Sequence, residues 1–345
     1  MPRPLHFSRS NGPVDEAIDR LLEMAGPVHH PDLVREMILA ALKAGQETEH
    51  RADLRLMNIT LKEMRFTSKV FGPYRGIRKV TVFGSARTRP DEPIYAMARE
   101  FGRALAEAGF MVITGGGPGI MQAAHEGAGP ERSFGVNIRL PFEQRANPVI
   151  EKTPRLITYN YFFNRKVAFL KEAHAVALFP GGFGTLDEAM ETLTLVQTGK
   201  QPPIPLVLVD EPGGTYWIRW IEFFERELLA EGYISPSDLF LFERVESVDD
   251  AVEKIQRFYR RYHSLRYVNG RLVLRLTQTI TEEQAARLAE EFSSILVPGG
   301  TIRVSGALPE EADEPELQGY PRLLVDFAKR DFGLLRRLID RLNEI

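Results

Sequence analysis

The chain has 345 residues, of which 43% are hydrophobic and 26% charged, an ordinary balance for a globular protein. Its formal charge of −3 excludes a general attraction to nucleic acid or anionic membranes, so we expect neither as a partner. The absence of cysteine excludes disulfides, thiolate metal sites and cysteine nucleophiles. No apolar run approaches the roughly 18 residues of a membrane span. Because MPRPLHFSRS also lacks the apolar core of a signal peptide, we expect a cytoplasmic location.

Residues 13–71 place apolar side chains at three- and four-residue steps, interrupted by Gly, Pro and His. This period predicts helices. We therefore assign residues 1–74 to an N-terminal helical extension, which ends in the linker GPYRG.

A second rhythm, of short apolar stretches alternating with amphipathic ones, fills residues 75–263. It predicts strands at 79–84, 110–114, 133–138, 175–180 and 205–210, and helices at 93–109, 119–128, 161–173, 185–199 and 217–232. Strands that alternate with helices indicate βα units. The fold class expected is α/β, with a doubly wound, mostly parallel, Rossmann-like sheet.

The pattern changes again over residues 264–345. Asn269-Gly270 lies between alternating apolar residues, a strong hairpin signal. The later segments complete a ββαββα order, which predicts a small appended α+β domain. The acidic stretch PEEADEPE (309–316) is expected to be a solvated loop.

Three similar glycine strings, at Pro180–Thr185, Pro212–Thr215 and Pro298–Thr301, raise the question of which one serves a ligand. The third follows a helix and resembles a helix-ending turn. The second follows two acids, which would repel an anion. Only the first joins a strand end, an extra glycine and a helix start, an arrangement that suits a phosphate because bare amides and the helix dipole face it.

Another interpretation of the same string is a capping box, with Thr185 as N-cap and Glu188 at N3. Two further glycine-rich strand ends, VFGSAR (82–87) and ITGGGPGIMQAA (113–124), favour a shared nucleotide-sized pocket over coincidental turns. Neither has the G-x-G-x-x-G spacing or the later acid of the dinucleotide fingerprint. A nicotinamide cofactor is therefore disfavoured.

Five motifs together carry a family resemblance: VFGSA, TGGGPGIMQAAHEGA, GVNIRLPFEQRANP, YFFNRK and PGGFGTLDE. In these motifs the chain resembles the Lonely Guy family of nucleoside 5′-monophosphate phosphoribohydrolases. The resemblance covers residues 75–262. It implies hydrolysis of AMP or a cytokinin riboside 5′-monophosphate to free base and ribose 5-phosphate by a homodimer or larger homo-oligomer. Because no H-x-x-H, H-E-x-x-H or aspartate cluster indicates a metal site, we expect neither metal nor cofactor. The resemblance assigns catalysis to Glu188 and Arg165, and substrate binding to Gly84, Ser85, Gly116, Gly117, Met121, Gly181, Gly182, Gly184 and Thr185.

The implied roles are chemically reasonable. Cleaving a ribosyl C–N bond develops positive charge at the anomeric carbon, and a carboxylate can stabilise it and activate water. Arg165 could grip the phosphate or a ribose hydroxyl, or keep Glu188 ionised. Asp187 and Glu191 are expected to be solvated or supporting acids, and His125 and His174 to be structural.

Two alternatives stay open. A carrier of a phosphorylated ligand, similar to molybdenum-cofactor carriers, would need the phosphate grip without the carboxylate. A nucleotide sensor with the C-terminal domain as output is neither favoured nor excluded. The older family label, possible lysine decarboxylase, would need a pyridoxal-phosphate lysine, and Lys166, Lys171 and Lys200 lie in no such motif. The sequence leaves open the preferred base and the roles of both appended segments.

Overall fold

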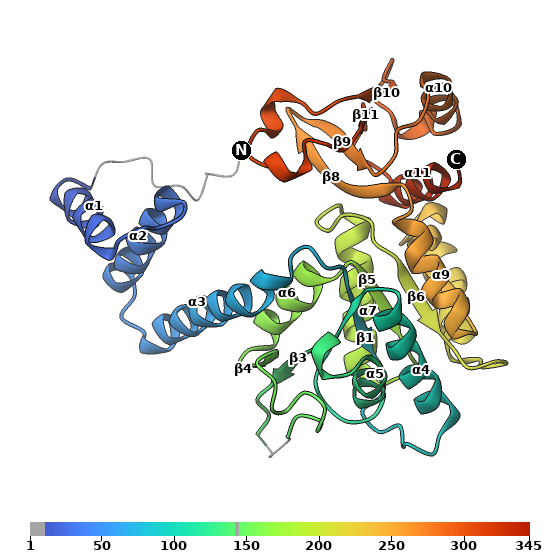
Figure 1. Cartoon of the computed structure of the whole chain (residues 1–345), viewed down its shortest axis with the longest axis horizontal. Coiled ribbons are helices and arrows are strands. Elements are labelled where there is room, and N and C mark those ends of the chain that lie inside the picture. Colours follow the sequence, from blue (N-terminus) through green and yellow to red (C-terminus); the bar gives the residue numbers. More distant parts are fainter. Residues whose placement is uncertain (1–10, 142–144) are drawn as a thin grey trace. The chain divides into compact units, whose positions relative to one another are not determined.

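The computed structural model of the chain describes residues 11–141 and 145–345 (Figure 1). It divides into two compact units, Met1–Arg65 and Phe66–Ile345. The boundary lies inside one helix, whereas the sequence placed it at residue 74. Two predictions fall on residues outside this range. They are the absence of a signal peptide in residues 1–10 and the part of the motif GVNIRLPFEQRANP at residues 142–144. None of the described helices combines the length and apolarity needed to cross a bilayer.

The first unit is helical, as predicted. It contains α1 (Pro13–Ala25), α2 (Pro31–Glu47) and most of α3 (Arg51–Phe71). Arg35 of α2 lies 2.6 Å from Asp15 of α1, and both helices begin with a proline, which suits the first helical turn. The ion pair and the buried side chains of Ile18 and Leu39 contribute to the packing of these helices.

The second unit is built on a seven-stranded sheet in which every neighbouring pair is parallel. The order is β4-β3-β2-β1-β5-β6-β7. The strands are β1 (Lys79–Phe83), β2 (Met111–Thr114), β3 (Ser133–Ile138), β4 (Leu156–Tyr159), β5 (Ala175–Leu178), β6 (Leu206–Val209) and β7 (Glu243–Val245). The predicted α/β fold class is therefore confirmed.

Helices cover both faces of this sheet, because alternate residues of each strand point to opposite sides. Val80 and Val82 of β1 join the core beneath α4, α5 and α9. Phe83 packs instead on Phe169 of α6, with ring centroids 4.8 Å apart. The helices of this domain are α4 (Pro93–Glu107), α5 (Ile120–Ala128), α6 (Phe162–Glu172), α7 (Phe183–Gln197), α8 (Tyr216–Phe223) and α9 (Val248–Phe258).

The prediction missed three elements of the sheet domain: β4, β7 and α9. The two strands lie at opposite edges of the sheet, are only three or four residues long and are partly exposed, so they lack a long apolar run. Helix α9 does carry a clear signal, since Ser247 caps it by accepting from Asp250 N–H.

The predicted ββαββα order of elements is present at the C-terminal end of the second unit. Its antiparallel sheet has the order β10-β11-β9-β8, and the Asn269-Gly270 turn joins β8 to β9 with φ values of 49° and 82°. The elements are β8 (Tyr262–Val268), β9 (Arg271–Leu276), α10 (Glu282–Glu291), β10 (Ile302–Ser305), β11 (Arg322–Val325) and α11 (Phe332–Glu344).

The acidic stretch 309–316 is not the solvated loop that was expected. It forms two 3₁₀ turns, and Glu311 is fully buried, 2.7 Å from Arg275 and 2.9 Å from Arg322. Burial opposes ionisation of Glu311, but hydrogen bonds from Arg322 and Arg275 outweigh it and hold its pKa at about 2. The expectation failed because charged residues are buried only when paired, and the partners are distant in sequence.

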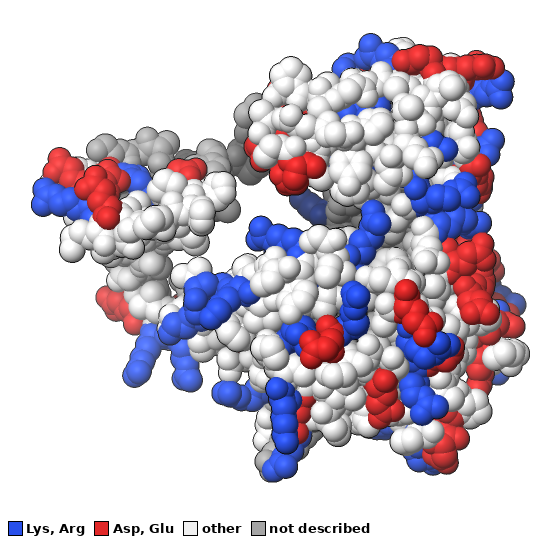
Figure 2. Space-filling view, viewed as in Figure 1, with Lys and Arg blue, Asp and Glu red and all other residues white. Residues whose placement is uncertain are grey.

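Positive and negative side chains are interspersed over the face of residues 66–345 shown in Figure 2. On that face of the described chain we see no continuous basic band of the kind that follows a nucleic acid backbone.

Arg336 links the C-terminal domain to the parallel sheet. Its buried guanidinium donates to the carbonyl of Ile204, to Glu243 (3.0 Å) and to Asp340 (3.0 Å). The first two partners belong to the sheet domain and the third to α11.

Replacing Arg336 with Leu is expected to lower the free energy of unfolding by about 1–3 kcal/mol, because the half-buried carboxylate of Asp340 and the carbonyl of Ile204 lose a charged hydrogen-bond donor. The exposed neighbour Arg337, 5.4 Å from the Phe240 ring, is the control, and Arg337→Leu should cost about 1 kcal/mol or less. Urea unfolding of both variants measures the difference. Equal losses would contradict a linking role for Arg336.

Candidate active site

A cavity lies where the strand order reverses, between β1 and β5. In doubly wound sheets, ligands bind at this switch point, beyond the carboxyl ends of the strands. The two strand ends are joined there, since Ser85 N–H donates to Pro180 O (3.1 Å). The cavity has a volume of about 790 Å³ and is lined by Phe83, Gly84, Ser85, Ala86, Arg87, Gly115, Met121, Arg165, Phe169, Gly181, Gly182, Phe183, Gly184, Thr185, Leu186 and Glu188.

The loop after β5 presents the N-terminus of α7 to this cavity. The helix has 15 residues and begins after Gly182, so its first-turn amides have no intrahelical acceptor. Gly181 is required by close packing, because a Cβ there would lie 2.2 Å from Thr185 Oγ1 and 2.9 Å from Ser85 N. Tyr216 of α8 fixes the same loop by donating to Gly181 O (2.7 Å). The result is a rigid amide cradle of the kind that binds anions.

Glu188 lies one turn further along α7 and is only 2% exposed. Neither of its carboxylate oxygens has a hydrogen-bond partner among the described residues. Burial raises the pKa of Glu188 to about 7, even though the charges of Lys166 and Arg165 lower it. A buried, unpartnered carboxyl that titrates near neutrality is a strong functional signal.

These facts rule out the capping box. The N-cap of α7 is Gly182, no side chain caps it, and Thr185 lies inside the helix. Glu188 is consequently past the first turn, too far along to bond the N-cap amide. Glycines 181, 182 and 184 allowed the helix to begin three residues earlier than an N-cap at Thr185 would place its start.

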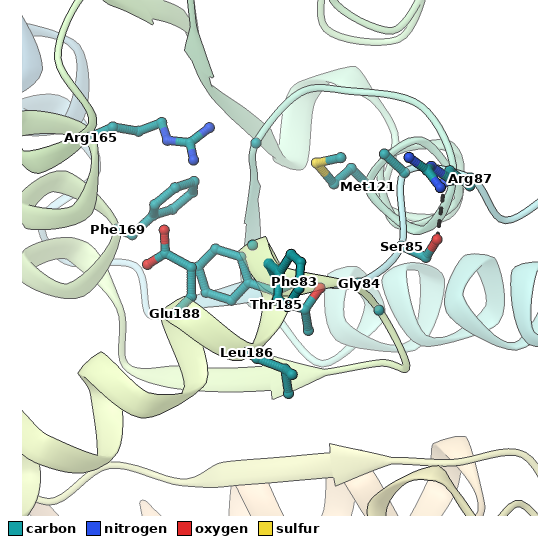
Figure 3. A pocket seen from close by; sticks show the side chains of 16 residues that line it. Phe83, Gly84, Ser85, Arg87, Met121, Arg165, Phe169, Thr185, Leu186 and Glu188 are labelled. Carbon is teal, nitrogen blue, oxygen red and sulfur yellow. Dashed lines mark hydrogen bonds between the residues drawn. The ribbon is translucent and has the colours of Figure 1, made fainter.

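Arg165, on α6, faces the same end of the cavity as Glu188, whereas Ser85, Arg87 and Met121 lie at the other end (Figure 3). Its guanidinium lies over the rings of Phe162 and Phe169, at 4.8 and 5.5 Å, and its buried Nε has no hydrogen-bond partner in the described chain. Burial lowers the pKa of Arg165, and the nearby charge of Glu188 partly offsets this. The side chain remains a cation with donors to spare.

Lys166, the next residue, was not singled out for the site by sequence reasoning. Its ammonium lies 2.7 Å from Glu191, 2.8 Å from Asp187 and 3.8 Å from Glu188. The last distance makes an ion pair but is too long for a hydrogen bond. Asp187 and Glu191, which were expected to be solvated or supporting acids, therefore bind a lysine that lies next to Glu188.

Most of the predicted site residues meet in this cavity. Those that line it are Glu188, Arg165, Gly84, Ser85, Met121, Gly181, Gly182, Gly184 and Thr185. Gly116 and Gly117 do not; both are buried, and their carbonyls accept from the backbone and side chain of Asn147. Gly115 lines the cavity in their place.

Sequence reasoning missed Phe83, Arg87, Phe169 and Phe183 as lining residues. Phe83 and Phe169 have no local signal, because they meet only when β1 and α6 pack. Arg87 could have been found, since it directly follows the glycine-containing end of β1.

His125 has the structural surroundings that were expected. It is fully buried, with Nε2 3.1 Å from Phe134 O and Nδ1 3.2 Å from the Asn147 amide. The carbonyl can only accept, so Nε2 carries the proton. Burial lowers the pKa of His125 to about 4, so it stays neutral.

Within residues 11–141 and 145–345, no group of three or more His, Asp or Glu side chains could hold a metal ion. That no metal takes part stays a prediction.

Residues 118–255 match the family model described as "Possible lysine decarboxylase". The rice (Oryza sativa subsp. japonica) protein named "Probable cytokinin riboside 5'-monophosphate phosphoribohydrolase LOGL5" is 26% identical over 61% of this chain and 83% of its own length. The "Pyrimidine/purine nucleotide 5'-monophosphate nucleosidase" of Escherichia coli (strain K12) is 26% identical over 52% of this chain and 43% of its own. A solved molybdenum cofactor carrier protein from Chlamydomonas reinhardtii is 20% identical over 52% of this chain and 97% of its own, with a TM-score of 0.36.

Replacing Glu188 with Gln is expected to stabilise the unliganded protein at alkaline pH. The pKa of Glu188 is about 7 in the folded chain, against an ordinary value of 4.5. Between these values the folded state binds more protons than the unfolded state, so stability falls as pH rises. We compare the free energy of unfolding of the variant with that of wild type at each pH. This difference should favour the variant by about 2–3 kcal/mol more above about pH 8 than near pH 4.5.

Urea unfolding of both proteins between pH 4.5 and 8.5 measures this gain. The matched control is Glu107→Gln, on the exposed surface of α4, which should change stability by less than about 0.5 kcal/mol at every pH. A difference between Glu188→Gln and wild type that does not change with pH would contradict a raised pKa for Glu188.

Proposed function

We propose that the chain is a member of the Lonely Guy family and that it hydrolyses the N-glycosidic bond of nucleoside 5′-monophosphates. The products would be a free base and ribose 5-phosphate. The observation that carries the proposal is the unpartnered, buried carboxylate of Glu188, one helical turn beyond an amide cradle suited to phosphate. In a nucleoside 5′-monophosphate the phosphate is attached to the ribose, so the phosphate can bind at the amides of the cradle while the ribose lies near the carboxylate.

The 5′-phosphate would bind at the N-terminus of α7. The amides of Gly182, Phe183 and Gly184 precede the first residue that donates within the helix, Thr185. They carry the partial positive charge of the helix dipole, and Thr185 Oγ1 adds a donor. The ribose would then lie toward Glu188.

Hydrolysis forms a bond from a water oxygen to C1′ and breaks the bond from C1′ to the base nitrogen. The bonding electron pair leaves with the base, and positive charge develops on the ribose ring. Glu188 as a carboxylate would stabilise that charge and accept the proton lost by water, and the departing base takes up a proton. A group that titrates near pH 7 suits such proton transfer.

Arg165 would hold the substrate against Glu188. Its guanidinium lies over two aromatic rings and keeps an unpartnered donor, so it can bind a ribose hydroxyl or a phosphate oxygen. Its charge also favours the ionised form of Glu188.

A phosphorylated-ligand carrier is the less favoured function. Such a protein needs the amide cradle, but it gains nothing from burying a carboxyl without hydrogen-bond partners, which costs folding free energy. Catalysis supplies a reason for the unpartnered group, and binding alone does not.

The surroundings of the cavity also disfavour decarboxylation through a lysine Schiff base. Burial opposes the charged form of Lys166, but hydrogen bonds to Asp187 and Glu191 outweigh it and raise its pKa. A lysine held as an ammonium is a poor nucleophile toward a carbonyl.

Replacing Glu188 with Gln should reduce kcat for AMP by roughly 100- to 10,000-fold, the contribution typical of an acid–base group. Release of ribose 5-phosphate measures turnover across the nucleoside monophosphates, and Glu107→Gln should retain full activity. Full activity of Glu188→Gln would remove the carboxylate from the mechanism.

The phosphate should be essential for turnover. AMP is expected to be hydrolysed and adenosine not, because only AMP can occupy the cradle at α7. Thr185→Val, which removes a buried donor, should raise KM for AMP about tenfold or more, as expected for one hydrogen bond to a charged group. Steady-state kinetics of both substrates provide the measurement, and equal turnover of adenosine and AMP would contradict this binding mode.

A further inference from the structure

Lys166 occupies a position that its neighbours determine closely. Asp187 and Glu191 lie just before Glu188 and one turn after it on α7, and both bind the ammonium at 2.8 and 2.7 Å. The lysine reaches them from α6, and its side chain is only 17% exposed. The two acids thus hold one positive charge 3.8 Å from Glu188.

Lys166 places a positive charge near Glu188 without forming a hydrogen bond to it. A direct hydrogen bond would occupy a carboxylate oxygen, but both oxygens of Glu188 are without one in the described chain. An opposite charge within about 4–6 Å favours the ionised form of a carboxyl through space. Lys166 can therefore favour the carboxylate while leaving both oxygens available for substrate or water.

The other charged groups that face Glu188 are Arg165 from α6 and the two acids from α7. Asp187 and Glu191 disfavour its ionisation, and Lys166 and Arg165 favour it. Without Lys166, Glu188 would face two like charges, and Arg165 would be its remaining cation among these groups.

We propose that Lys166 is a positioning residue, whose tethered ammonium favours the carboxylate form of Glu188 while leaving both of its oxygens free of hydrogen bonds. This inference rests on the proposed function in so far as it concerns catalysis. It assigns different tasks to adjacent cations, since Arg165 contacts the substrate and Lys166 acts only through Glu188.

The test is the pH profile of kcat/KM for AMP in Lys166→Met. The acid limb, where activity falls as Glu188 becomes protonated, should move to higher pH by about one to three pH units. At pH values above the limb, activity should return to within roughly threefold of wild type, because no group that touches the substrate is lost. Lys166→Arg retains the charge and should retain the wild-type limb.

Lys171→Met is the matched control, since Lys171 lies on the same helix, is half exposed and pairs with Glu172. It should leave the limb unchanged. An equal loss of activity at every pH in Lys166→Met, with the limb unmoved, would overturn the proposal and indicate a direct catalytic or purely structural role.

A second measurement separates this inference from the proposed function. Carbon-13 NMR of the glutamate side chains, assigned with Glu188→Gln, follows the titration of Glu188 in the unliganded protein. An upward shift of that titration in Lys166→Met supports the proposal even if no nucleotide is hydrolysed, in which case the proposed function alone fails. An unshifted titration overturns the proposal even if AMP is hydrolysed.

Discussion

The burial of one carboxyl group, that of Glu188, is the constraint on which this site depends. A carboxylate removed from water is unfavourable unless nearby charges compensate it. Here the compensation comes from Arg165 and Lys166, neither of which forms a hydrogen bond with it. The group is therefore poised between its two protonation states, and its oxygens are uncommitted. A hydrogen-bonded carboxylate would be more stable and less reactive.

The sheet topology determines where this carboxyl lies. Strand order reverses between β1 and β5, so the chain leaves both strands in different directions and opens a cavity between the loops. Ser85 links these loops to the next glycine-rich turn, because its amide donates to Pro180 O and its carbonyl accepts from Ile120 N–H. Three strand ends thus share one hydrogen-bonded frame, and α7 starts from it. The position of Glu188 follows from that starting point.

Local signals in the sequence are sufficient for the fold and much of the site. Buried parallel strands read as apolar runs, and Asn269-Gly270 specifies its hairpin. The glycine strings marked the strand ends at the cavity. What the sequence could not provide were contacts between distant elements: Lys166 with the acids of α7, and Glu311 with Arg275 and Arg322. A charged residue appears solvated in a sequence until its partner is known. The prediction of Thr185 as the N-cap of α7 was wrong for a different reason, since the neighbouring glycines permit the helix to start at more than one residue.

The C-terminal domain takes part in the same scaffold. Gly199, with φ of 70°, ends the turn after α7, and a Cβ there would lie 2.1 Å from the ring of Phe332 at the start of α11. Gln197, the last residue of α7, donates to Asp238, and α11 packs beside that segment. Helix α7 is therefore fixed at its first turn by the frame around Ser85 and at its last turn by the C-terminal domain. The position of Glu188 relative to Lys166, 3.8 Å away on α6, therefore depends on packing at both ends of α7.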